Sequence, residues 1–128
     1  MTGRVMASEE SVRAWVVAAA AAADDKQADD VVVLDVGDVL SITGWFVICD
    51  GSNARQVRTI ADAVEEQVSE IGGPKPLRVE GRDGLHWVLI DYGDFVVHVF
   101  DAETRRYYDL ERLWSDVPRI DWQEEATA

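Results

Sequence analysis

The sequence contains few of the residue types on which secreted, membrane-spanning and zinc-binding proteins depend. It has one cysteine, Cys49, and two histidines, His86 and His98, so it can form no internal disulfide and has too few ligands for a Cys/His zinc site. The longest uncharged apolar run, residues 15–23, is far too short to span a bilayer and follows acidic residues instead of a basic leader. These absences predict a cytoplasmic protein with no membrane segment and no bound metal.

Basic residues are also scarce. The chain has 12 lysines and arginines against 25 aspartates and glutamates, giving a net charge of -13 that would repel the phosphates of DNA or RNA. Direct nucleic-acid binding is therefore not expected. The same charge favours encounter with a basic protein surface, because complementary fields raise association rates. The alternative is that the acidic composition only keeps a cytoplasmic protein in solution. Composition does not decide between these two interpretations.

The sequence does contain enough apolar material for one core. At 128 residues and 48% apolar composition, one domain is expected. Ser8 is placed to cap a helix over residues 8–25, whose apolar positions form one stripe. Residues 31–34 are a β-branched run without polar alternation, which indicates a central strand. A second strand, residues 45–49, ends where Asn53 can begin a long amphipathic helix.

The second half of the chain predicts mainly strands. The long helix ends at a Gly-Gly-Pro stop, after which a short strand, a hairpin, an edge segment and a short helix are expected over residues 77–80, 87–100, 105–108 and 109–114. The acidic residues 116–128 predict a flexible tail. The expected fold is a single α/β domain over residues 1–115, with its core over residues 30–115 and a sheet of about five strands flanked by helices.

The strand pair from Trp87 to Phe100 is the sharpest functional feature of the sequence. If its turn has two or four residues, Asp91 pairs with Asp94 and Trp87 pairs with His98. Alternation then divides the side chains between two faces. The core face carries Val88, Ile90, Phe95, Val97 and Val99, and the opposite face carries Trp87, Leu89, Asp91, Asp94, Val96, His98 and Phe100. The second set mixes aromatic, aliphatic, acidic and imidazole groups, which is typical of a face that meets a partner.

Two structural alternatives remain open for this second face. The amino-terminal helix could cover it, with Trp87 and His98 forming an ordinary cross-strand pair whose polar atoms are satisfied locally. A three-residue turn would instead exchange the partners of the two faces.

An enzymatic interpretation rests on Gly51 and Ser52, which end a strand just before a helix, where a phosphate could meet amide groups and the helix dipole. A magnesium-dependent nucleotidyl or phosphoryl transferase also needs two closely spaced carboxylates, and the strand after this helix offers only Glu80. Neither Cys49 nor His98 has the partners of a nucleophile or a general base. No catalytic residue and no cofactor is assigned, and the transferase is kept as the alternative function.

Several segments taken together resemble the ribosomal silencing factors, also called the Iojap family. Between Asp30 and Trp114 they are, in order, VVVLDV, SITGWFVICDGSNARQV, Glu80-Gly81, WVLIDYGDFVVHVF and RRYYDLERLW. Their order and spacing are specific to this family. Gly44 and Asp50 stand where the family usually has an aspartate and a serine, while the amino-terminal helix and the residues from Asp116 onward carry no family motif.

The resemblance implies a mixed sheet flanked by helices, similar to nucleotidyltransferases but without their catalytic acids. It implies a translational repressor and not an enzyme: a protein that binds the large ribosomal subunit through ribosomal protein fourteen, blocks joining of the small subunit and slows translation during starvation. It also implies a homodimer when the protein is free. Carried over by position, the partner-binding residues are Trp87, Asp91, Tyr92, Asp94, His98, Phe100, Tyr108 and Leu110.

Overall fold

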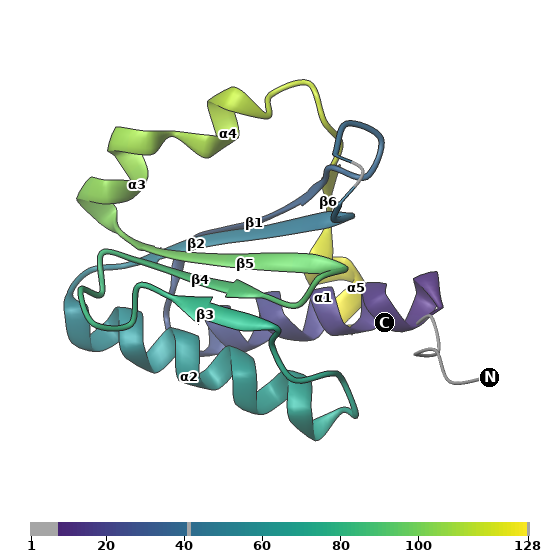
Figure 1. Ribbon diagram of the computed structural model, residues 1–128, viewed down its shortest axis with the longest axis horizontal. Coiled ribbons are helices and arrows are strands. Elements are labelled where there is room, and N and C mark those ends of the chain that lie inside the picture. Colours follow the sequence, from purple (N-terminus) through teal and green to yellow (C-terminus); the bar gives the residue numbers. More distant parts are fainter. Residues whose placement is uncertain (1–7, 41, 128) are drawn as a thin grey trace.

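The computed structural model describes residues 8–40 and 42–127, which form one mixed β-sheet with helices on both faces (Figure 1). The sheet has six strands in the order β3-β4-β5-β2-β1-β6. The strands are β1 Asp29–Asp35, β2 Trp45–Gly51, β3 Arg78–Glu80, β4 Trp87–Asp91, β5 Phe95–Asp101 and β6 Arg119–Ile120. The helices are α1 Glu9–Asp25, α2 Ala54–Glu70, α3 Ala102–Tyr108, α4 Leu110–Leu113 and α5 Trp122–Thr127. The predicted α/β class is confirmed.

Strand β2 is the centre of the sheet. All seven of its residues are buried, and it pairs antiparallel with β1 and parallel with β5, which makes the sheet mixed as expected. Strand β1 is internal too, since β6 pairs with its other edge by placing Ile120 opposite Val33. The run of β-branched residues over 31–34 therefore marked an internal strand correctly.

Helices α1 and α2 both begin where their caps predict. The Ser8 side chain accepts a hydrogen bond from the backbone N–H of Ser11 at 3.0 Å, and the Asn53 side chain accepts one from Gln56 at 2.8 Å. The two helices pack against each other and bury their apolar stripes against the same face of the sheet. Helix α1 therefore does not cover the second face of the hairpin. None of the helices among the described residues is long and apolar enough to cross a membrane.

Strands β4 and β5 form the predicted hairpin, but the register differs from the expected one by two residues. Trp87 lies opposite Phe100 instead of His98, because the chain turns at Gly93 and Asp94. Gly93 has φ +86°, a conformation that glycine adopts without strain. A shift of two residues preserves the alternation of side chains, so the strand residues of the two sets lie on the two faces as predicted, whereas Asp94 lies in the turn.

The segment after β5 is helical, and the predicted edge segment over residues 105–108 is wrong. Asp101 ends β5 and caps α3, its carboxylate accepting from the backbone N–H of Thr104 at 2.7 Å. Asp109, with φ 48°, separates α3 from α4 and makes no side-chain cap. We refer to residues 102–114 as the strap, because it crosses the sheet face opposite α1 and α2 (Figure 1).

Residues 116–127 include β6 and α5 and do not form the flexible tail expected from their acidic composition. Trp122 is 7% exposed, and its indole N–H donates to the carbonyl of Val31 at 2.9 Å. Glu125 forms a two-bond ion pair with Arg13 of α1, with both distances 2.7 Å. The carboxyl-terminal residues thus close one edge of the sheet and cover part of α1.

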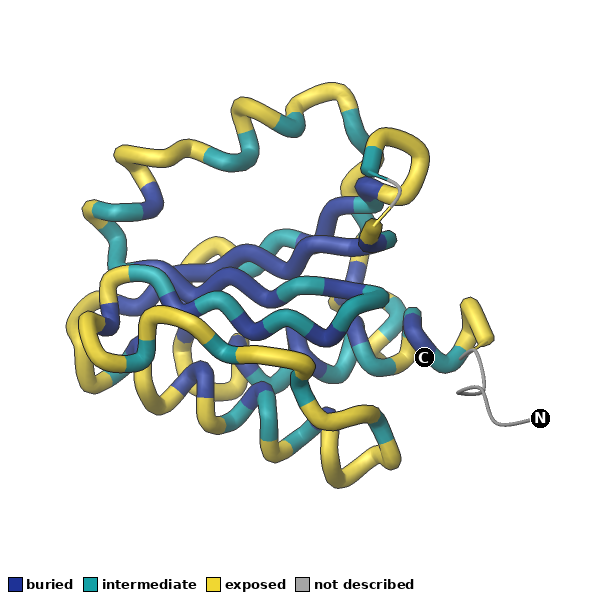
Figure 2. Tube along the Cα trace, viewed as in Figure 1, coloured by how far each residue is buried: buried dark blue, intermediate teal, exposed yellow. Residues whose placement is uncertain are grey.

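The sheet separates two apolar cores, visible as buried segments of the strands in Figure 2. The larger core lies between the sheet and α1 with α2. The smaller core lies beneath the strap and contains Leu34, Val36, Phe46, Ile48 and Phe100.

Candidate partner-binding face

The strap covers the second face of the sheet incompletely. Leu110, Trp114 and Val117 pack on the smaller core, where Trp114 meets Phe46 of β2 edge-on. On the hairpin side of this face, Trp87, Leu89, Asp91 and Val96 are only half-buried. We call the following group the open face: Trp87, Leu89, Asp91 and Val96 of the hairpin, with Tyr108 and Leu110 of the strap.

Trp87 is the largest side chain of the open face and is held on three sides. Its ring centroid lies 4.8 Å from that of Phe100 and 4.8 Å from that of Tyr108. Its indole N–H donates to Nδ1 of His98 at 3.1 Å. Tyr108 itself is 50% exposed, so the aromatic pair extends from the hairpin to the outside of the strap.

His98 lies beneath Trp87 and is only 5% exposed. Its ring meets Phe46 edge-on, with centroids 4.7 Å apart. Burial lowers the pKa of His98 to about 4, so the imidazole is neutral at physiological pH. Since Nδ1 accepts from Trp87, the proton resides on Nε2, which is buried and has no hydrogen-bond partner among residues 8–40 and 42–127. An unpaired buried donor costs about 1–3 kcal/mol.

The two acids of the hairpin are partly engaged within the chain. Asp91 accepts the backbone N–H of Gly93 at 2.8 Å and Nε of Arg78 at 3.3 Å, which leaves its side chain 22% exposed. Asp94 is half-buried at the turn, where its carbonyl accepts the backbone N–H of Gly44 at 2.9 Å. The carboxylate of Asp91 therefore stands at the rim of the open face and helps to shape the turn, to which Asp94 contributes its backbone.

The structure separates the residues expected to bind a partner into accessible and inaccessible ones. Trp87, Asp91, Asp94, Tyr108 and Leu110 are half-buried or exposed. Tyr92, His98 and Phe100 are 2%, 5% and 0% exposed, so a partner cannot reach them in this conformation. Tyr92 belongs to the opposite core, where it stacks on Phe95 with centroids 4.5 Å apart and where burial raises its pKa to about 12. Because Tyr92 lies beside the turn, no sequence pattern indicated that its side chain would be buried.

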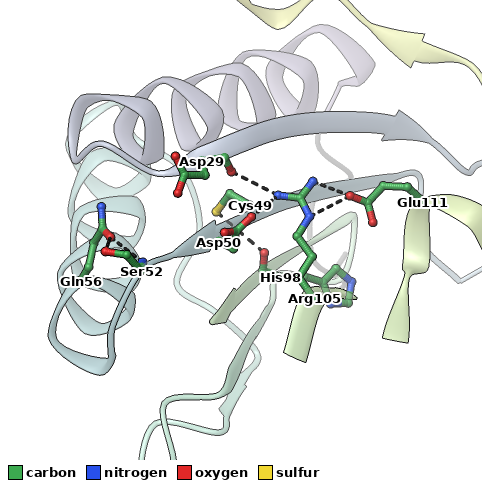
Figure 3. A network of polar contacts seen from close by, with 8 residues as sticks. All are labelled: Asp29, Cys49, Asp50, Ser52, Gln56, His98, Arg105 and Glu111. Atoms are coloured by element: carbon green, nitrogen blue, oxygen red, sulfur yellow. Dashed lines mark hydrogen bonds and ion pairs between the residues drawn. The ribbon is translucent and has the colours of Figure 1, made fainter. Parts of the chain in front are cut away.

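A buried network of ion pairs and hydrogen bonds, which no sequence pattern indicated, connects the strap to the sheet (Figure 3). Arg105 of α3 donates to the carboxylate of Asp50 at 2.7 Å and to the carbonyl of Asp29 at 3.1 Å. Its Nε also donates to Glu111 at 2.8 Å. Burial raises the pKa of Asp50 despite the opposing effect of Arg105. Burial lowers the pKa of Arg105, but Glu111 and Asp50 outweigh it and the net shift is upward.

The residues considered for catalysis either form hydrogen bonds within the chain or are buried. The backbone N–H and the hydroxyl of Ser52 both donate to the side-chain oxygen of Gln56, at 2.7 and 2.8 Å, at the point where a phosphate would meet the helix (Figure 3). Cys49 is fully buried, which raises the pKa of its thiol to about 12. Across residues 8–40 and 42–127, no three His, Cys, Asp or Glu side chains are grouped so that they could hold a metal ion.

The fold thus defines a single-domain α/β protein with two long helices on one sheet face and a second face that the short helices of the strap cover incompletely. A sequence model described as "Ribosomal silencing factor during starvation" matches residues 9–128, which includes both the amino-terminal helix and the carboxyl-terminal elements that carry no recognisable motif. The chain belongs to the ribosomal silencing factor family, which places it among regulators of translation associated with the ribosome.

Individual relatives agree with this assignment. The chain is 45% identical over 96 residues to "Ribosomal silencing factor RsfS" of Bacillus subtilis, covering 75% of this chain and 80% of that protein. It is 28% identical over 92 residues to "Mitochondrial assembly of ribosomal large subunit protein 1" of Mus musculus, covering 70% of this chain and 40% of that protein.

Two solved structures share the fold. One, from Chromobacterium violaceum, has a TM-score of 0.75 at 33% identity over 86% of this chain and 88% of that one. The other, from Bacillus halodurans, has a TM-score of 0.72 at 37% identity over 88% of this chain and 99% of that one.

Proposed function

We propose that this protein binds the large ribosomal subunit through ribosomal protein fourteen, prevents the small subunit from joining, and so lowers translation during starvation. The observation that carries the proposal is the unequal covering of the sheet. Two long helices bury one face, whereas the other leaves an aromatic and aliphatic group half-buried beside the strap. In a family of ribosome-associated regulators, such a face is the best candidate for docking.

The open face has the composition of an interface centre. Trp87 and Tyr108 offer large apolar rings with a polar tip, the residue types that most often dominate binding energy. Leu89, Val96 and Leu110 surround them with aliphatic surface. Asp91 at the rim and Asp94 in the adjacent turn suit a basic partner, and the net charge of -13 raises the rate of encounter with one.

Steric exclusion suffices for the proposed activity. A folded domain of this length is roughly 30 Å across, which is enough to obstruct a surface that the small subunit must contact. No substrate has to be turned over. We include in the proposal a cytoplasmic location and a homodimeric free state, whose interface has to leave or release the open face before docking.

Co-sedimentation with purified large subunits tests the proposal. Trp87→Ala is expected to weaken binding at least about 10-fold, as truncation of a central aromatic anchor does, whereas Trp15→Ala, a half-buried tryptophan on α1, serves as the matched control. Asp91→Arg is expected to weaken binding, with Asp62→Arg on α2 as the matched charge reversal. Added small subunits should compete with the wild-type protein.

Full binding by folded Trp87→Ala and Asp91→Arg would refute the docking face. Magnesium-dependent nucleotide turnover that is lost in Ser52→Ala would support the transferase instead.

A further inference from the structure

We infer that His98 is a positioning residue of the docking face: its Nδ1 accepts the indole N–H of Trp87 and fixes the orientation in which that ring meets the partner. The inference rests on the proposed docking function. It differs from that proposal because His98 acts through Trp87 and makes no contact with the partner itself.

The geometry of the pair is specific. Trp87 lies opposite Phe100 and His98 lies opposite Leu89, so the tryptophan and the histidine are diagonal neighbours on one face of the hairpin. Their ring centroids are 5.8 Å apart with an interplanar angle of 43°, and the hydrogen bond between Nε1 and Nδ1 is 3.1 Å long. A half-buried indole N–H normally has a hydrogen-bond partner, and here that partner is Nδ1 of His98.

The aromatic contacts alone do not determine the direction of the indole. Phe100 and Tyr108 lie beside the ring at 4.8 Å each, at interplanar angles of 31° and 50°. Apolar contacts of this kind tolerate a ring flip, because either edge of the indole can pack between them. The hydrogen bond to His98 distinguishes the two orientations, since only one points the N–H inward.

The burial and the neutral ring of His98 fit a role as the hydrogen-bond acceptor for Trp87. The side chain is 5% exposed, so it cannot reach a partner, and its neutral ring leaves Nδ1 free to accept. Its other nitrogen, Nε2, is buried and finds no hydrogen-bond partner within the described part of the chain. An aliphatic residue of similar size would avoid that unpaired group, so stability alone does not account for a histidine here. The hydrogen bond that His98 accepts from Trp87 does account for it.

Holding an anchor side chain in its bound orientation reduces the entropy that docking must offset. We therefore expect His98→Leu, which removes the acceptor, to weaken binding to purified large subunits by roughly 3- to 10-fold, the effect of freeing one side chain. His98→Asn is the matched variant, because its Oδ1 can occupy the place of Nδ1, and it should retain most of the affinity.

The experiment combines binding with a direct readout of the hydrogen bond. The indole N–H resonance of Trp87, assigned by its loss in Trp87→Phe, should move upfield in His98→Leu and stay near its wild-type position in His98→Asn. In the Trp87→Phe background, which has no N–H to position, His98→Leu should cause no further loss of binding. If His98→Leu does not fold, Trp87→Phe removes the same hydrogen bond from its other end and should itself weaken binding.

The outcomes separate this inference from the proposed function. Loss of binding in Trp87→Ala with wild-type binding in a folded His98→Leu would overturn the positioning role and leave the docking face standing. Equal losses caused by His98→Leu with and without the indole N–H would also overturn it, because the histidine would then act through general packing. Full binding by Trp87→Ala would overturn both.

Discussion

Arg105 in the strap and Asp50 at the end of β2 form an ion pair of 2.7 Å, with only 10% and 8% of their side chains exposed. The pair joins a short helix to the most buried strand of the sheet, and Glu111 completes it from α4. The strap is otherwise held mainly by apolar contacts on the smaller core. The position of Tyr108 on the open face therefore depends on a charge cluster centred on Arg105, one turn earlier in the same helix.

Arg105→Leu is expected to destabilise the protein by about 3–5 kcal/mol, because it leaves the carboxylates of Asp50 and Glu111 buried without a counter-charge. Urea unfolding followed by circular dichroism measures the change. Arg106→Leu, at the exposed neighbouring position, is the control and should alter the unfolding free energy by less than about 0.5 kcal/mol. An unchanged urea midpoint for Arg105→Leu would mean that the ion network contributes nothing to stability.

Gly81→Ala should be far more harmful than Gly72→Ala. Both glycines have positive φ, +87° and +83°, but a Cβ on Gly81 would lie 1.9 Å from the carbonyl oxygen of Trp87, whereas one on Gly72 meets nothing within 4 Å. We expect a loss of about 1 kcal/mol for Gly72→Ala from backbone strain and more than about 3 kcal/mol for Gly81→Ala. Thermal unfolding of both variants tests this, and equal losses would contradict the close approach of Gly81 to β4.

Trp122→Ala should cost about 3–5 kcal/mol, the range for removing a large buried aromatic side chain. Its indole fills space between β1 and α1 and bonds to the carbonyl of Val31. Gln123→Ala, one residue further on an exposed position, is the control. If residues 116–127 behaved as a loose tail, the two substitutions would have equally small effects on the unfolding free energy.

His98 should make the protein less stable as the pH falls from about 6.5 to about 4. The folded state depresses the pKa of this side chain to about 4, so in that window the unfolded chain binds a proton that the native state excludes. Stability therefore decreases by about 1.4 kcal/mol per pH unit from this group, up to about 3 kcal/mol in total. Urea titrations at several pH values should show the slope in the wild type and a flatter one in His98→Leu, and equal slopes would exclude the histidine as its source.

The elements that sequence analysis predicted well are those whose signals are local. The caps at Ser8 and Asn53 and the apolar stripes behind them specify α1 and α2 without reference to the rest of the chain. The faces of the hairpin were also assigned correctly although its register was not, because an even shift preserves alternation.

The features that were missed depend on residues far apart in the chain. Asp50 and Arg105 meet across 55 residues, and no spacing rule connects a carboxylate at a strand end with an arginine in a later helix. The segment around Tyr107 and Tyr108 has aromatic residues typical of strands, yet the cap at Asp101 and the contacts of Arg105 favour a helix there. Trp122 likewise becomes buried only because α1 and β1 already provide its site.

The docking of β6 and α5 has a consequence for how the chain reaches its native state. Their contacts join positions 91 residues apart, Val31 and Trp122, and 112 residues apart, Arg13 and Glu125. Contacts with such long sequence separation form slowly, because a large loop has to close before they contribute. During synthesis, α1 and β1 leave the ribosome well before the residues that cover them. A protein of a family that silences ribosomes therefore completes its own fold only after the ribosome has made almost all of the chain described here.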